Sequence, residues 1–227
     1  MAIRHWIRLP TAAVLTFALA ACVSDGPSRE EASRQARSGP VREASRSTAA
    51  EIATALDSAT RTASGLTPVA RSAEDICHAG SGNGFSSHDD YRLLCRRDEA
   101  RYFGADNLLD ALREIDNGDG LTPIITDTLD DVVRYYARNG RADDGSLLPR
   151  PNLSYTVAQH GWTLAVAWSG PTDPRSNVPD YGLTWPIVFN DSEPVDLDAL
   201  WNGPLASHGY LIVLSLSVAY HEAPWTD

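Results

Sequence analysis

The chain has 227 residues, with nineteen arginines, no lysine and thirty acidic residues, so its net charge is −11. The lack of lysine excludes Schiff-base catalysis, the Walker phosphate-binding loop and the Ser-x-x-Lys acyl-enzyme motif. Residues 73–227 hold ten arginines and twenty-four acids, a net charge of −14, which excludes nucleic acid as a partner because that needs a basic surface.

The first 21 residues have the layout of a bacterial export signal. Arg4 and Arg8 precede an apolar run over residues 11–21, which is shorter than the about 20 apolar residues that cross a bilayer. Leu19-Ala20-Ala21-Cys22 ends the run and resembles the lipobox of bacterial lipoproteins. The resemblance implies cleavage before Cys22, a diacylglyceryl group on its sulfur, and anchoring to the outer face of the cell membrane. An ordinary cleaved signal peptide is the alternative.

Residues 22–42 contain almost no apolar side chains and predict a flexible tether between the membrane and a folded domain. From about Glu43 a thin apolar stripe at helical spacing predicts the first helix, which ends at Ser64-Gly65. We expect residues 43–227 to form one α+β domain, with a possible internal duplication of residues 43–126 and 127–220.

Alternation of apolar and polar residues predicts most of the strands. Pro68 favours an edge position for the first strand, because proline donates no hydrogen bond to a neighbour. The later strands offer a continuous apolar face, which helices must cover, so we predict a two-layer α+β sandwich with a mostly antiparallel sheet. The first predicted strand starts over residues 66–72, and the later ones span 90–102, 153–158, 162–169, 183–189 and 210–220. The predicted helices span 107–116, 127–139 and 196–208.

Two cysteines, Cys77 and Cys95, remain once Cys22 is assigned to the anchor. An even pair outside the cytoplasm is normally oxidised, so we predict a disulfide that closes a loop of about 19 residues and contributes about 3 kcal/mol. A metal site with His78 and His88 is the alternative, but the spacing is not that of zinc ligands, and we predict no metal.

No complete catalytic motif is present in the sequence. The hydrolase elbow Gly-x-Ser-x-Gly is absent, and Gly80-Ser81-Gly82 resembles it only loosely. The acidic run from Asp116 to Gly120 fails as a calcium loop, because Ile115 occupies the first ligand position. The two catalytic carboxylates of a glycosidase have no fixed spacing in a sequence, so the twenty-four acids of residues 73–227 could include such a pair. We predict no cofactor.

Arg92, Arg96, Arg97 and Arg101 form the basic concentration of the folded part. Guanidinium groups grip phosphates and carboxylates, although pairing with neighbouring acids is the alternative. Trp225 lies beyond the last strand and is a candidate exposed aromatic. The candidate ligand-binding residues are therefore Arg92, Arg97, Arg101 and Trp225.

Residues 90–95, 101–104 and 208–211 resemble segments of small uncharacterised lipoproteins of high-GC Gram-positive bacteria, a resemblance that implies no activity. We expect a non-enzymatic, lipid-anchored domain that binds an envelope protein or a small ligand. The alternative is a cell-surface hydrolase acting on wall or glycan material. A structural lipoprotein without a small ligand is the third possibility.

Overall fold

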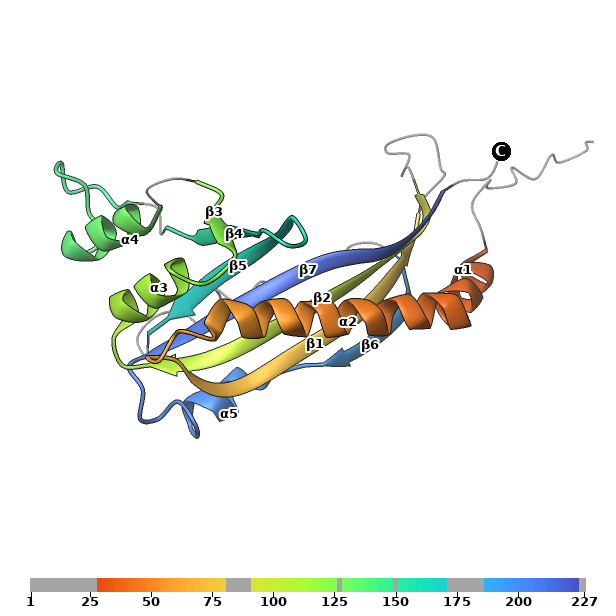
Figure 1. The fold of residues 1–227 in the computed structure, drawn as a ribbon, viewed down its shortest axis with the longest axis horizontal. Helices are drawn as coiled ribbons and strands as arrows, with labels where there is room; N and C mark the ends of the chain where they lie inside the picture. Colours follow the sequence, from red (N-terminus) through yellow and green to blue (C-terminus); the bar gives the residue numbers. More distant parts are fainter. Residues whose placement is uncertain (1–27, 81–90, 126–127, 149–150, 171–185, 225–227) are drawn as a thin grey trace, which may run out of the picture.

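A computed structural model describes residues 28–80, 91–125, 128–148, 151–170 and 186–224. Within these residues, seven strands form one open antiparallel sheet, and five helices accompany it (Figure 1). The predicted α+β class with an antiparallel sheet is confirmed. The predicted signal peptide, Cys22 and Trp225 lie outside the described residues.

The sheet has the strand order β3-β4-β5-β7-β2-β1-β6. Its centre consists of the long strands β1, β2 and β7, and β2 pairs with β7 along nearly the whole of both strands. Strand β1 is not an edge strand as predicted, because it lies between β2 and β6. Pro68 itself lies in the part of β1 that β6 does not reach, beside an irregularity in the pairing with β2, so its missing N–H costs no hydrogen bond to β6. The strands are β1 (Thr67–Ala79), β2 (Tyr91–Ala105), β3 (Leu121–Pro123), β4 (Leu153–Val157), β5 (Trp162–Ser169), β6 (Ile187–Glu193) and β7 (Tyr210–Pro224).

The prediction of a flexible tether is wrong for residues 29–42. They form helix α1 (Arg29–Ala36) and the start of α2 (Gly39–Thr60). Ala32, Ala36 and Val41 are buried against the sheet, and Ser28 caps α1 by accepting a hydrogen bond from the backbone of Glu31. Small buried side chains give a weak hydrophobic signal, so a composition poor in large apolar residues conceals these helices.

The remaining helices are α3 (Leu108–Asp116), α4 (Thr128–Ala137) and α5 (Leu197–Trp201). The first two agree with the predicted helices at 107–116 and 127–139. The third is much shorter than the predicted helix at 196–208, because Gly203 and Pro204 follow it and neither continues a helix well.

Helices pack on both faces of the sheet. Ile212 and Leu214 of β7 belong to the largest core cluster, with α2, α3 and Val132 of α4. Leu211 and Val213, which alternate with them, pack with α5 in another cluster. Because successive residues of a strand point to opposite faces, both sides of β7 are buried.

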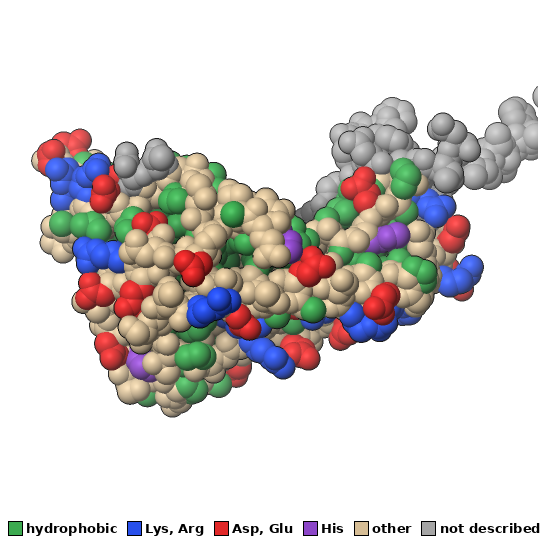
Figure 2. Space-filling view, in the orientation of Figure 1, with side chains coloured by type: hydrophobic (Ala, Val, Ile, Leu, Met, Phe, Trp, Pro, Cys, Tyr) green, Lys and Arg blue, Asp and Glu red, His purple; other side chains and the backbone are tan. Residues whose placement is uncertain are grey.

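The ends of the molecule differ in the elements that they contain. Helix α1, β6 and the C-terminal end of β7 lie at one end, and α3, α4 and α5 lie at the other (Figure 1). Helix α2 runs between the two ends. The face drawn in Figure 2 carries acidic and basic side chains intermixed over both ends.

The disulfide between Cys77 and Cys95 is present in the structure. The two cysteines are direct partners in the pairing of β1 with β2, and both are fully buried beside α1 and β6. The predicted disulfide is therefore confirmed as a link between neighbouring strands at the α1 end.

Replacing both cysteines by alanine (C77A/C95A) should lower the free energy of unfolding by about 3 kcal/mol, because the unfolded chain regains the freedom of a closed loop. Urea denaturation followed by circular dichroism measures the loss. Unfolding in the presence of a reductant is the control: it should bring the wild type to the level of the variant and leave the variant unchanged. A wild-type curve that does not respond to the reductant would contradict the prediction.

Candidate functional site

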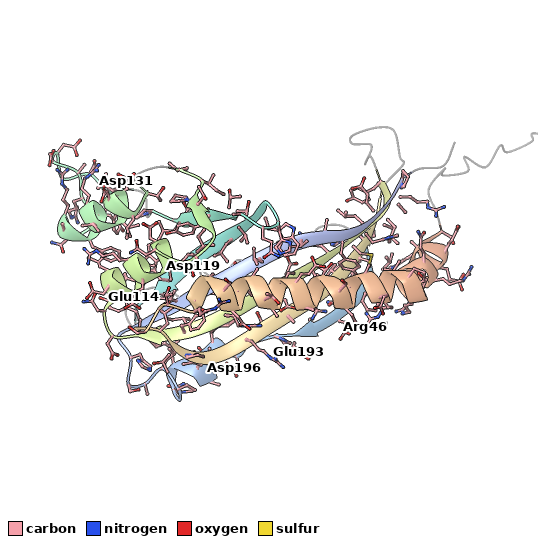
Figure 3. All side chains as sticks on the ribbon, in the orientation of Figure 1. Arg46, Glu114, Asp119, Asp131, Glu193 and Asp196 are labelled. Atoms are coloured by element: carbon pink, nitrogen blue, oxygen red, sulfur yellow. A yellow bond between two sulfur atoms is a disulfide. The ribbon has the colours of Figure 1, made fainter. Side chains whose placement is uncertain are left out.

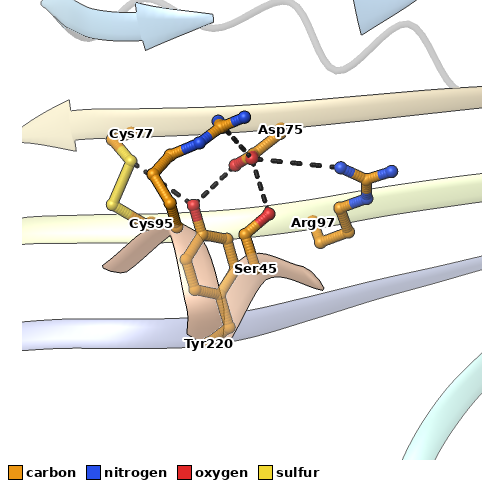
Figure 4. The surroundings of a disulfide bond; sticks show 7 residues. Ser45, Asp75, Cys77, Cys95, Arg97 and Tyr220 are labelled. Atoms are coloured by element: carbon orange, nitrogen blue, oxygen red, sulfur yellow. Dashed lines mark hydrogen bonds and ion pairs between the residues drawn. A yellow bond between two sulfur atoms is a disulfide. The ribbon is translucent and has the colours of Figure 1, made fainter. Parts of the chain in front are cut away.

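A buried carboxylate joins α2 to the sheet (Figure 4). Asp75 of β1 is 0% exposed, and it accepts hydrogen bonds from Ser45 Oγ at 2.6 Å and Tyr220 OH at 2.5 Å. Arg42 forms an ion pair with it at 3.2 Å, and Arg97 lies 3.9 Å away. A buried charge is tolerated only when it is paired and hydrogen-bonded, and this carboxylate has both kinds of partner.

Three elements bring these partners to Asp75. Arg42 and Ser45 are three residues apart, so they lie on the same side of α2. Tyr220 comes from β7 at an irregularity in the pairing with β2. Burial, and then the hydrogen bond to Asp75, raise the pKa of Tyr220 well above its ordinary value, so the phenol stays neutral and keeps the proton that it donates.

The candidate residues Arg97 and Arg101 lie close together and share one acid. Arg97 Nε donates to Glu99 Oε1 at 3.0 Å, and Arg101 lies 3.8 Å from the other oxygen of this carboxylate. Arg101 also lies 3.9 Å from Asp57 of α2. The neighbouring acids therefore balance the charge of both arginines. Their contacts agree with the alternative given for them in the sequence analysis, which is pairing with acids.

Arg92 is separated from this pair of arginines. Its guanidinium donates to Gln35 Oε1 at 2.9 Å and lies 3.8 Å from Glu31, so it fastens α1 to the sheet. Arg96 alternates with Arg97 and therefore lies on the other face of β2 from Arg97, and its Nε donates to Asp98 Oδ2 at 2.8 Å. The fourth candidate, Trp225, is outside the described residues. The four arginines thus do not form one cluster.

Two histidines occupy unusual positions, His78 in β1 and His208 just before β7. His78 is 4% exposed, and burial followed by the charge of Arg96 lowers its pKa, so its imidazole is neutral. His208 Nδ1 lies 3.0 Å from Asp106 Oδ1, and a Cβ atom on Gly104 would collide with its ring. Gly104 pairs with Leu211, so the predicted segments 101–104 and 208–211 meet in space.

A hollow of about 190 Å³ lies between α3, α4 and β4. Tyr155, which is 1% exposed, donates its hydroxyl to Asp116 Oδ1 at 3.0 Å. Burial and this carboxylate raise the pKa of Tyr155 far above its ordinary value. The lining consists of Asp116, Pro123, Thr128, Leu129, Asp130, Leu153, Ser154 and Tyr155.

Asp116 is placed where a carboxylate is locally unfavourable. It is the last residue of α3, and the C-terminal end of a helix dipole repels negative charge. Local rules are most often broken at functional sites, which makes Asp116 a candidate for ligand contact. Two carboxylates, three hydroxyls and an apolar wall suit a small ligand that carries a positive charge or hydroxyl groups.

Sequence reasoning missed this hollow. Asp116 appears in the sequence as part of a failed calcium loop, and Tyr155 as an ordinary inward-facing strand residue. The two residues are 39 positions apart, and no local spacing joins them. The sequence offers only the alternation of β4, which predicts that Tyr155 points into the core but not that it meets Asp116.

The described residues lack a metal centre or a catalytic triad. No group of three or more His, Cys, Asp or Glu side chains within them is arranged to hold a metal ion. In the same residues, no hydrogen bond joins a serine hydroxyl to a histidine ring. Each of the described helices is too short or too polar to span a bilayer.

Asp75→Ala should lower the free energy of unfolding by about 3 kcal/mol, because the buried hydroxyls of Ser45 and Tyr220 lose their acceptor. Asp191→Ala is the matched control: Asp191 lies 3.6 Å from the same Arg42 but is 64% exposed, so its loss should be about 1 kcal/mol or less. Urea denaturation of the two variants measures the difference. Equal losses would show that the buried cluster has no special role.

Comparison with known proteins places this chain in no family. No family model matches it, no curated protein matches it, and no solved structure matches it.

Proposed function

We propose that the protein is a lipid-anchored extracytoplasmic module that binds an envelope protein or a small ligand and has no catalytic activity. Leu19-Ala20-Ala21-Cys22 carries the proposal, because it ends an export-signal layout and resembles the lipobox of bacterial lipoproteins, in which the cysteine accepts the lipid. The disulfide between Cys77 and Cys95 supports export, since structural disulfides persist in oxidising compartments.

The hollow beside Asp116 is the binding site that we propose for a small ligand. A volume of about 190 Å³ suits a molecule of a few heavy atoms. Asp116 and Asp130 would attract a cationic group, while Thr128 and Ser154 offer hydroxyls for orientation. Ile124 and Ile125, which directly follow Pro123 in the lining, are 48% and 65% exposed and would let a larger partner contact the same region.

For the architecture, we propose the two-layer arrangement as the finer description. Helices α2 and α3 contribute most of the helical side of the largest core cluster and would form the helical layer. Helix α5 has only five residues and covers a smaller part of the opposite face.

A cell-surface hydrolase is the second candidate, and one observation favours it. Asp116 and Asp130 line the same hollow, and glycoside hydrolysis uses a pair of carboxylates that flank the bond to be cleaved. The lining contains no tryptophan, which weakens the case for a sugar platform.

Protein purified from membranes should carry a diacylglyceryl group on Cys22, which mass spectrometry of the N-terminal peptide detects. Crosslinking of intact cells followed by pull-down should then enrich one defined partner. Cys22→Ala, which cannot be lipidated, is the control and should leave the membrane fraction and lose the partner. An unmodified Cys22 thiol in protein recovered from the cytosol would refute the proposal.

Incubation with purified wall material should release no soluble fragments if the protein is a binding module. Release that disappears in Asp116→Asn and Asp130→Asn would instead support the hydrolase, because the amide cannot serve as acid, base or nucleophile. Asp119→Asn, a substitution of a nearby exposed acid outside the hollow, is the matched control and should change nothing. Chromatography of the soluble fragments provides the measurement.

A further inference from the structure

We propose that the domain stands on the bilayer with its α1 end against the lipid headgroups, so that the hollow beside Asp116 faces away from the membrane. The inference rests on the proposed lipidation of Cys22. It assigns α1 and the first turns of α2 as the surface that meets the lipid, and the α3–α4 end as the surface that meets other molecules.

The link between the anchor and the fold is short. Only six residues separate Cys22 from Arg29, the first residue of α1. Six residues span at most about 22 Å when fully extended, whereas the tether expected from the sequence would allow about three times that distance. Helix α1 is therefore confined to the neighbourhood of the bilayer, whatever conformation the link adopts.

Helix α1 is fixed to the domain. Arg29 donates to the carbonyl oxygen of Ile187 at 3.2 Å, and Arg92 donates to Gln35 at 2.9 Å. Ala32 and Ala36 are 1% and 0% exposed, so the inner side of the helix packs into the core. Helix α2 follows after two residues and is held by the buried Asp75 cluster. A constraint on α1 is thus a constraint on the whole domain.

The hollow lies at the opposite end of the molecule. Helix α2 has 22 residues, a length of about 33 Å, and it runs from α1 toward α3 (Figure 1). Just beyond its end, Glu114 of α3 accepts a hydrogen bond from the backbone N–H of Gly65 at 2.8 Å. Asp116 follows two residues later, so the hollow is separated from α1 by about the length of α2.

Net charge disfavours the alternative in which the domain lies flat. Residues 29–46 hold five arginines and three glutamates, but Asp191 of β6 and Glu222 of β7 lie at the same end and offset this excess. Residues 106–144 hold ten acids and four arginines, a net charge of −6. Figure 3 shows Arg46 toward the α1 end and Glu114, Asp119 and Asp131 at the other. Anionic headgroups therefore repel the α3–α4 end much more strongly than the α1 end, within a Debye length of about 10 Å.

Fluorescence quenching at the membrane surface tests this orientation. Glu30→Cys in α1 and Leu147→Cys, at a position 77% exposed beyond α4, each provide a thiol for a fluorophore when Cys22 is lipidated. The lipidated variants are reconstituted into vesicles of phosphatidylcholine and phosphatidylglycerol that contain a headgroup nitroxide quencher. Quenching at position 30 should be at least about threefold stronger than at position 147, because nitroxides quench only at short range. Equal quenching, or stronger quenching at position 147, would overturn the proposal.

Lengthening the link between Cys22 and α1 tests whether the short link, and not electrostatic interaction with the headgroups, holds α1 at the bilayer. Inserting about twelve Gly and Ser residues after Ser24 should reduce quenching at position 30, because the domain can then leave the surface. Unchanged quenching would show that the short link does not hold α1 at the bilayer, and would overturn this step.

Failure of lipidation can be told apart from failure of the orientation. If mass spectrometry finds Cys22 unmodified, the proposed function falls. The orientation is then tested with Cys22 coupled to a maleimide lipid in the same vesicles. In this case the fluorophores are attached to unnatural tyrosine analogues introduced at positions 30 and 147, because thiol labelling would also modify Cys22. The same threefold contrast would support the orientation, and its absence would refute it.

Discussion

The buried carboxylate of Asp75 is the constraint on which the arrangement of helix and sheet depends. Its partners come from α2, β2 and β7, so the charge is compensated only when these elements have their observed positions. A shift of α2 by one turn would remove Arg42 and Ser45 from Asp75 and leave a buried charge without its main partners. Apolar packing alone would tolerate such a shift better, because hydrophobic contacts are not directional.

Because the chain has no lysine, arginine supplies all of its permanently positive side chains. Guanidinium groups form directed contacts with carboxylates, and the arginines of β2 are paired in this way with Asp75, Asp98 and Glu99. The basic concentration that is evident in the sequence therefore serves to hold strands and helices together. The candidate ligand contacts are instead acids at the α3–α4 end. There Asp116 lines a hollow and accepts a hydrogen bond from the neutral phenol of Tyr155.

Sequence patterns predicted the parts of the fold in which one face of an element differs from the other. Strands β4 and β5 alternate clearly, β7 alternates only from Leu216 onward, and α3 carries leucine and isoleucine side chains on one side. Helix α1 escaped detection because its buried residues are alanines, and the second half of β1 because Asp75 and His78 are buried polar residues. The hollow could not be predicted, because it forms between residues that only the sheet brings together.

The long strands β2 and β7 lie along the axis that joins the α1 end to the α3–α4 end (Figure 1). Backbone hydrogen bonds between antiparallel strands are perpendicular to the strands. A pull between the two ends of the molecule would therefore load many of these bonds together in shear, instead of opening them one after another as in a zipper. The central sheet would therefore resist such a pull with many hydrogen bonds at once.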